Sequence, residues 1–98
     1  MTTYLGTAAT QSGSRYLQQL CKHWGHKFKV DFDPAHGRIE FDPDTVCVLD
    51  ADAEGLSIRL DAADSARAER MTGVVADHLK RFAFREELVV EWRQQAAA

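Results

Sequence analysis

The sequence has few of the residues that build specialised small folds. It has two cysteines and two prolines among 98 residues, and its longest apolar runs are only a few residues long. A disulfide scaffold needs more cysteines, and a membrane-spanning helix needs about 20 apolar residues, so neither class fits. The first ten residues lack the basic cluster and apolar run of a signal peptide. We therefore expect a cytoplasmic protein without a membrane segment.

The common motifs of catalysis and metal binding are also missing. There is no glycine-rich phosphate loop, no G-x-S-x-G turn, no Cys-x-x-Cys and no H-E-x-x-H. Cys21 and Cys47 lie far apart inside apolar runs, which favours buried structural thiols. We expect no cofactor and no resident metal, and the sequence favours a protein that is not an enzyme.

Charge is unevenly distributed along the chain. The net charge is −3, yet residues 39–64 hold eight acidic residues and one arginine. Nucleic-acid affinity depends on clustered Lys and Arg, so an acidic centre argues against that partner. The simplest interpretation of the acidic segment is the solvated face of a sheet.

A helix is predicted from Ser14 to Trp24. Its apolar residues are spaced at i, i+3, i+4 and i+7, after a polar segment in which Ser12 or Ser14 could cap the helix. Gly25 follows, where a glycine with positive φ commonly ends a helix. The apolar stripe consists of Leu17, Leu20, Cys21 and Trp24.

Beyond Gly25 the apolar period changes to two. Four alternating or β-branched segments are separated by turns rich in Asp, Pro and Gly, a pattern typical of an antiparallel meander with one wet face. The predicted strands cover residues 28–32, 39–41, 45–49 and 56–60. A weak strand is expected within residues 1–10, and a frayed tail at residues 94–98.

The second helix has the strongest pattern in the chain. Asp61 or Asp64 could cap it, and its apolar stripe is Met71, Val74, Val75, His78, Leu79 and Phe82. A closing strand is expected over residues 88–92. Two amphipathic helices and a sheet with one apolar face predict a single α+β domain over residues 1–98, a two-layer sandwich with both helices on one face.

Three histidines and two arginines are the candidate ligand-binding residues. His23 and His26 form an H-x-x-H pair, although Gly25 between them leaves a metal site doubtful and a polar helix end is the simpler interpretation. His78 lies on the apolar stripe, as a hydrogen-bonded core residue or as part of a pocket lining. Arg81 and Arg85 could form a fork for an anion if the helix reaches Arg85.

The simpler interpretation of the two arginines is internal pairing. Arg81 could bind Asp77, and Arg85 could bind Glu86 or Glu87. The fourth histidine, His36, lies in a predicted turn and is expected to be solvated.

The scattered pattern of these residues resembles the bacterial family named domain of unknown function 2218. The positions that carry the resemblance extend over nearly the whole chain: Arg15-Tyr16-Leu17, Leu20, His23, Gly25-His26-Lys27, Gly37-Arg38, Asp77-His78-Leu79, Arg81-Phe82, Arg85-Glu86 and residues 88–92. The resemblance implies a β-α-β(4)-α two-layer fold like the TATA-binding protein and the last domain of phosphohexomutases. It implies no catalytic residues, and an association with siderophore-interacting reductases or iron-uptake proteins.

Three functions remain open at this point. The first is a non-enzymatic binding or accessory module, linked to iron or siderophore handling, that uses a groove between helices and sheet. The second is a protein-interaction or homodimerisation domain that pairs through sheet edges or a helix face. The third is a small enzyme with a histidine as general base. Convergence of His23, His26 and His78 on one concavity would favour the first or the third.

Overall fold

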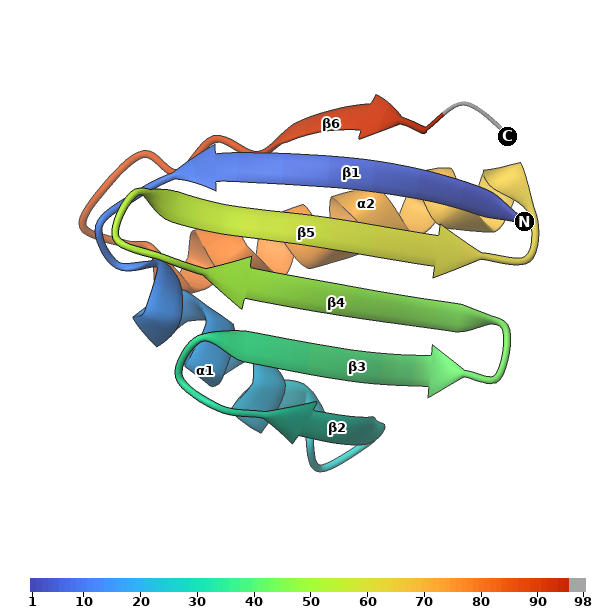
Figure 1. The fold of residues 1–98 in the computed structure, drawn as a ribbon, viewed down its shortest axis with the longest axis horizontal. Helices are drawn as coiled ribbons and strands as arrows, with labels where there is room; N and C mark the ends of the chain where they lie inside the picture. The colour runs from blue at the N-terminus through green and yellow to red at the C-terminus, as the bar shows by residue number, and fades with distance from the viewer. Residues whose placement is uncertain (96–98) are drawn as a thin grey trace.

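Six strands form one antiparallel sheet, and both helices pack on the same face of it (Figure 1). The computed structural model describes residues 1–95. The strand order is β2-β3-β4-β5-β1-β6, so β1 lies between the predicted meander and the closing strand. The two-layer α+β sandwich predicted from the sequence is confirmed. The elements are β1 (Thr2–Ala9), α1 (Gly13–Trp24), β2 (Lys29–Phe32), β3 (His36–Asp42), β4 (Thr45–Ala51), β5 (Gly55–Ala62), α2 (Ser65–Phe82) and β6 (Glu91–Gln94).

Helix α1 has the predicted buried stripe, begins one residue before the predicted start and ends at Trp24 as predicted, but its two ends are not capped as expected. Neither expected serine caps it: Ser12 is the N-cap residue without a side-chain cap bond, and the Ser14 hydroxyl donates to the Pro34 carbonyl at 2.5 Å. Gly25 has φ −62°, so the helix does not end on a left-handed glycine. The positive-φ prediction is wrong because the backbone continues into a tight turn, where the Gly25 N–H still donates to the Cys21 carbonyl.

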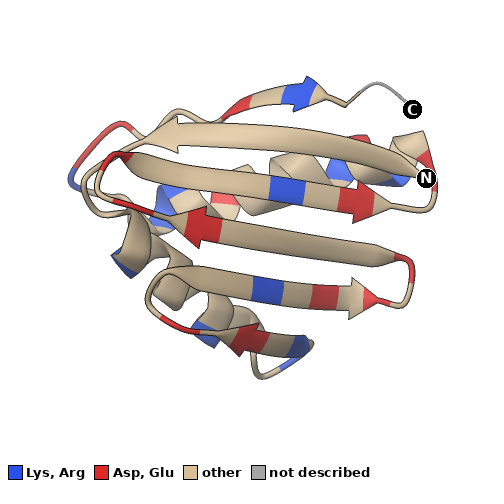
Figure 2. Cartoon of the chain, viewed as in Figure 1, with Lys and Arg blue, Asp and Glu red and all other residues tan. Residues whose placement is uncertain are grey.

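The sheet has one apolar face and one charged face. The side chains that point toward the helices from β3, β4 and β5 are almost fully buried. Charged residues of both signs alternate with these buried residues along β3 and β5 and so point to the opposite face. Figure 2 shows their positions as blue and red bands on the strands. This confirms the alternation expected of an antiparallel sheet with one solvated face. The buried residues include Ile39, Cys47, Leu49, Leu56, Ile58 and Leu60.

Helix α2 begins after one of the two aspartates that the sequence suggested as its N-cap. The Asp64 carboxylate accepts a hydrogen bond from the Arg67 N–H at 2.8 Å, so Asp64 rather than Asp61 caps the helix. The predicted stripe divides in two: Met71, Val75 and Leu79 are buried, and the other three are half-buried. Thr72, which is not part of the predicted stripe, is also buried. The stripe therefore faces both the sheet and a groove beside α1.

The closing strand lies further along the chain than predicted. The predicted segment begins at Leu88, which is buried without pairing in the sheet, and β6 pairs with β1 only from Glu91 onward. Gln94 ends β6, and the Gln95 N–H donates to the Thr3 carbonyl at 2.8 Å, so these two residues of the expected frayed tail are held by β1. Residues 96–98 of that tail lie outside the described residues.

Both cysteines are buried free thiols, as expected. Burial raises the pKa of Cys21 to about 11 and raises the pKa of Cys47 as well. No helix among the described residues is long and apolar enough to cross a membrane.

Candidate functional site

A pocket of about 630 Å³ lies between the end of α1 and the middle of α2. All three candidate histidines line it, from three different places in the chain: the last turn of α1, the turn after it, and the exposed flank of α2. We call it the imidazole pocket. Its lining residues are His23, Trp24, His26, Lys27, Phe28, Phe41, Arg67, Met71, Val74 and His78.

A tight turn brings the two histidines of the H-x-x-H pair to one pocket. The N–H groups of Lys27 and Phe28 donate to the Trp24 carbonyl at 3.0 and 2.8 Å. The chain therefore turns back at the end of α1, and His26 reaches the pocket from the turn rather than from a continuous helix. Both His23 and His26 are exposed, so their imidazoles are accessible to a ligand.

His78 is held in one tautomer by the helix on which it lies. Its Nδ1 is 2.7 Å from the Val74 carbonyl oxygen. A carbonyl can only accept a hydrogen bond, so Nδ1 carries the proton in the neutral ring and Nε2 carries the lone pair. The His23 ring centroid is 5.4 Å from that of His78, at an interplanar angle of 45°. The two imidazoles form the polar centre of the pocket.

Aromatic rings form the apolar wall. The Trp24 centroid is 4.8 Å from that of His78 and 5.0 Å from that of Phe41, and Phe28 packs edge-on against Phe41 at 5.0 Å. Edge-to-face packing at these distances holds rings in defined orientations. The wall is therefore largely ordered before any ligand binds.

Arg67 is a fixed guanidinium at the mouth of the pocket. Its Nε donates to Thr45 Oγ1 at 2.8 Å, and one terminal nitrogen donates to Asp42 Oδ2 at 2.6 Å. The pKa of Asp42 lies below its ordinary value, first because its carboxylate accepts a hydrogen bond from the Asp44 N–H, and further because of Thr45 and Arg67. The remaining guanidinium N–H groups are available to an anion.

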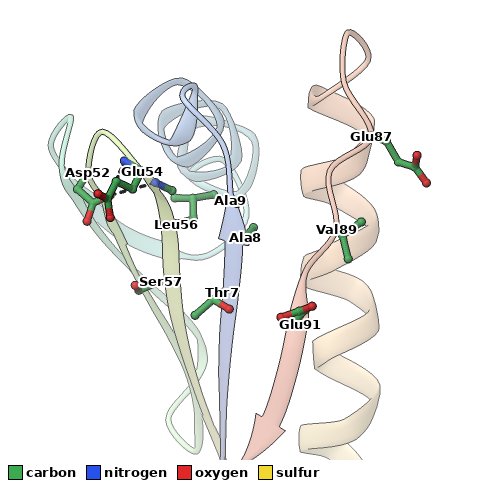
Figure 3. A pocket seen from close by; sticks show the side chains of 11 residues that line it. Thr7, Ala8, Ala9, Asp52, Glu54, Leu56, Ser57, Glu87, Val89 and Glu91 are labelled. Carbon is green, nitrogen blue, oxygen red and sulfur yellow. Dashed lines mark hydrogen bonds between the residues drawn. The ribbon is translucent and has the colours of Figure 1, made fainter.

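The imidazole pocket is lined by bases and no acids, although the chain has a net charge of −3. Another pocket, near the β4–β5 turn and the start of β6, has the opposite chemistry (Figure 3). Four carboxylates line that pocket, from Asp52, Glu54, Glu87 and Glu91, together with the exposed Val89. The molecule thus separates a basic, aromatic pocket from an acidic one.

The residues of the imidazole pocket do not make a complete metal site. Among residues 1–95, no group of three or more His, Cys, Asp and Glu side chains is placed to hold a metal ion. Two imidazoles held by one tetrahedral ion, at metal–nitrogen distances of about 2.0–2.1 Å, would have their centroids roughly 5 Å apart. The spacing of His23 and His78 fits that value, so an ion here would need further ligands from a bound molecule.

The two candidate arginines do not reach the imidazole pocket. Helix α2 ends at Phe82, so Arg85 lies beyond the helix and the condition for an Arg81–Arg85 fork, a helix that reaches Arg85, is not met. The Arg85 guanidinium lies 5.5 Å from the Phe84 ring centroid. Within the described residues neither arginine forms an ion pair, so the expected internal pairing is also wrong.

His36 is exposed as predicted but has a partner. Its Nδ1 is 2.7 Å from Asp50 Oδ1, across the β3–β4 pair.

The sequence pattern did not point to Lys27, Arg67 or Phe28 as residues of the pocket. Lys27 and Phe28 were not recognised because the turn after α1 was not predicted to fold back. Arg67 was not recognised because its position depends on the β3–β4 turn lying beside the first turn of α2. The H-x-x-H spacing and a histidine on an apolar stripe were the only signals that pointed to this place.

A solved relative has the same fold. The NMR structure of PA4090 from Pseudomonas aeruginosa is 40% identical to this chain, with a TM-score of 0.80. The match covers 95% of this chain and 96% of that one. No protein of curated function matches.

The family match agrees with the resemblance noted in the sequence. The model of a family described as uncharacterized protein conserved in bacteria (DUF2218) matches residues 6–93, which is most of the chain. The chain therefore belongs to the DUF2218 family of uncharacterised bacterial proteins.

Proposed function

We propose that this chain is a non-enzymatic binding module whose site is the imidazole pocket. Its ligand is a small anionic molecule with an aromatic or other planar apolar part. The observation that supports this most is the convergence of three imidazoles, Lys27 and Arg67 on one aromatic-walled pocket without a lining carboxylate.

The charges of the pocket favour an anion. Arg67 is permanently charged and already oriented by two hydrogen bonds, so it loses little side-chain freedom when a ligand binds. Lys27 is exposed and can swing toward a bound carboxylate or phenolate. His78 offers a lone pair at Nε2 to a ligand hydroxyl, because its Nδ1 proton is engaged by Val74.

The walls favour a flat apolar body. Ligand pockets of roughly 300–1,000 Å³ typically combine aromatic walls with a few placed polar groups, and this pocket follows that pattern. Trp24 contacts both the His78 ring and Phe41, so a planar group bound beside the imidazoles would lie against this aromatic wall. The apolar part would provide burial, and the bases would set orientation.

An iron chelate of the phenolate or catecholate class has this chemistry, and we propose it as the finer form of the function. Such chelates are anionic and aromatic, and their iron brings its own ligands to a site with an incomplete donor set. In this form the module acts in the cytoplasm beside a siderophore-interacting reductase or an iron-uptake protein. Its support is the chemistry of the pocket and the resemblance noted in the sequence.

The enzymatic alternative has less support from the geometry. A histidine that acts as general base is commonly oriented by a carboxylate, whereas His78 is oriented by the Val74 backbone carbonyl. No Ser, Thr or Cys hydroxyl or thiol lines the pocket. The pocket therefore has no nucleophile of those types for an imidazole to activate.

The proposal is tested by titrating a panel of ligands into the protein. The panel contains salicylate, 2,3-dihydroxybenzoate, the ferric complexes of aryl siderophores, benzoate and a neutral phenol. Binding is followed by calorimetry and by Trp24 fluorescence, because this indole lines the pocket. We expect anionic aryl compounds to bind and the neutral phenol to bind at least about tenfold more weakly.

Variants decide whether the imidazole pocket is the site. His78→Ala and His23→Ala should each weaken binding about tenfold or more, the cost of a hydrogen bond to a charged ligand. Arg81→Ala is the matched control, since Arg81 is a base on the same helix that does not line the pocket. Equal affinity in His78→Ala and wild type, or no binding by any compound of the panel, would overturn the proposal.

A further inference from the structure

Strand β2 is an open edge of the sheet with an exposed aromatic residue. Within residues 1–95 it has β3 on one side and no strand on the other, and Phe32 is 40% exposed. We propose that two copies of the chain pair through β2 in an antiparallel register centred on Val30, which would join the two sheets into one of twelve strands. This inference is independent of the ligand proposed above.

The backbone of β2 can form this pairing. The Asp33 N–H donates to the His36 carbonyl, so these two residues form a hydrogen-bonded pair. In the β2–β3 register the next hydrogen-bonded pairs are Asp31 with Arg38 and Lys29 with Glu40. Hydrogen-bonded and free residues alternate along an antiparallel edge, so the N–H and C=O of Val30 and Phe32 face outward. A second β2 centred on Val30 would exchange both bonds of that residue.

The side chains of residues 28–32 are complementary to themselves in this register. Residues whose numbers add up to 60 lie opposite each other, so Phe28 meets Phe32 and Lys29 meets Asp31, each twice. On the face that carries the helices, apolar side chains meet apolar side chains. On the solvated face every lysine meets a carboxylate. Cross-strand pairs of both kinds stabilise sheets.

The charges of β3 extend this pattern. Glu40 lies opposite Lys29, and Arg38 lies opposite Asp31, within one copy. Across the proposed interface, four charged side chains lie side by side on the solvated face: Glu40 and Lys29 of one copy, then Asp31 and Arg38 of the other. Their charges alternate in sign from one strand to the next. Charged edge strands normally discourage pairing. Here the alternating charges favour pairing with β2 of a second copy and disfavour pairing with strands whose charges do not complement Lys29 and Asp31.

The other edge of the sheet is less suited to the same pairing. Strand β6 centred on Trp92 would also place Glu91 opposite Arg93, but it would place Val90 opposite the polar Gln94. Thr7 and Leu5, which lie opposite these charges on β1, carry no charge to extend the row. Trp92 already packs on Gly6, where an added Cβ would approach the ring to 2.8 Å.

A charge exchange between two variants tests the proposal. Lys29→Glu puts like charges opposite Asp31 in both halves of the dimer, and Asp31→Lys puts like charges opposite Lys29. We expect wild type to dimerise in sedimentation equilibrium and each variant alone to dimerise at least about tenfold more weakly. An equimolar mixture of the two variants should recover the dimer, because every cross-strand pair between them is attractive.

Two further measurements keep the test decisive. Far-ultraviolet circular dichroism shows that each variant is folded, and recovery in the mixture can occur only if both are. Arg93→Glu, the matched charge reversal on β6, should leave dimerisation unchanged. A wild type that stays monomeric at the highest attainable concentration, mixed variants that stay monomeric, larger assemblies instead of dimers, or loss of the dimer in Arg93→Glu would each overturn the proposal.

Discussion

One close contact between α1 and the sheet depends on a glycine of β3, Gly37. A Cβ built on Gly37 would lie 2.7 Å from Cys21 Sγ and 3.3 Å from Leu17 Cδ2. Both neighbours are fully buried, so neither can move into solvent. The absence of a side chain at this position of β3 lets the helix rest on the strand. Without that contact the end of α1, which carries half of the imidazole pocket, would stand further from the sheet.

Gly37→Ala should therefore lower the free energy of unfolding by about 1–3 kcal/mol, the usual cost of overpacking a core. The same change should cost less in a Cys21→Ala background, because the sulfur that the new methyl group meets is then absent. Urea unfolding of the four proteins of this cycle measures the coupling. If Gly37→Ala lowers the free energy of unfolding equally in both backgrounds, the contact with Cys21 is not the reason that this position requires glycine.

At the residue scale, the sequence identified candidate site residues better than it predicted which residues they contact. His23 and His26 were singled out by their H-x-x-H spacing, and His78 because an imidazole on an apolar stripe needs a hydrogen-bond partner. Arg81 was named as a candidate and Arg67, which lines the pocket, was not, because spacing along a helix does not show which turn of the sheet lies beside it. That information is carried by the Asp42 contact, which joins residues 25 positions apart.

At the element scale, α2 contains a position where the chain gains nothing from glycine. Gly73 is exposed in the middle of the helix, and an added Cβ would meet no atom within 4 Å. Gly73→Ala should raise the free energy of unfolding by about 0.5–1 kcal/mol, because alanine loses less backbone entropy in a helix. Thermal and urea unfolding measure the gain. It is also a control for Gly37→Ala, since the chemical change is identical and only the surroundings differ; a loss of stability would contradict this account.

The ends of the elements were harder to predict than their existence. Periodicity predicted both helices and the meander because burial of an apolar face is a property of the segment itself. Ser12 occupies the N-cap position of α1, but its hydroxyl makes no cap bond, and its own N–H donates to the Thr10 hydroxyl. The closing strand was placed too early because Leu88 is buried in the hydrophobic core without pairing in the sheet.

At the scale of the whole molecule, the sequence did not contain the strand order. Local patterns predict strands, but the insertion of β1 between β5 and β6 is a long-range choice. One carboxylate helps to hold that arrangement. Glu86 Oε2 accepts from the Tyr16 hydroxyl at 2.5 Å and from Thr10 Oγ1 at 3.0 Å, and so connects α1, the end of β1 and the segment that leads into β6.

Glu86→Ala should therefore loosen β6 and lower the stability of the whole domain. Tyr16 is 2% exposed, and its hydroxyl would lose its carboxylate acceptor at a cost of about 1–3 kcal/mol. Amide hydrogen exchange in β6 should accelerate more than exchange in β3. Tyr16→Phe is the matched control: if the Tyr16 contact is what matters, Glu86→Ala should cost less in the Tyr16→Phe background.

The same contact makes alkaline stability depend on Glu86. The hydrogen bond to Glu86, followed by burial and the carboxylate charge, raises the pKa of Tyr16 above its ordinary value. The folded chain then holds this proton more tightly, so the stabilisation is complete below about pH 10 and is lost as pH rises through the folded pKa. Between about pH 8 and about pH 11 the wild type should lose more stability than Glu86→Ala. Parallel urea midpoints for the two proteins over that range would mean that Glu86 does not control the titration of Tyr16.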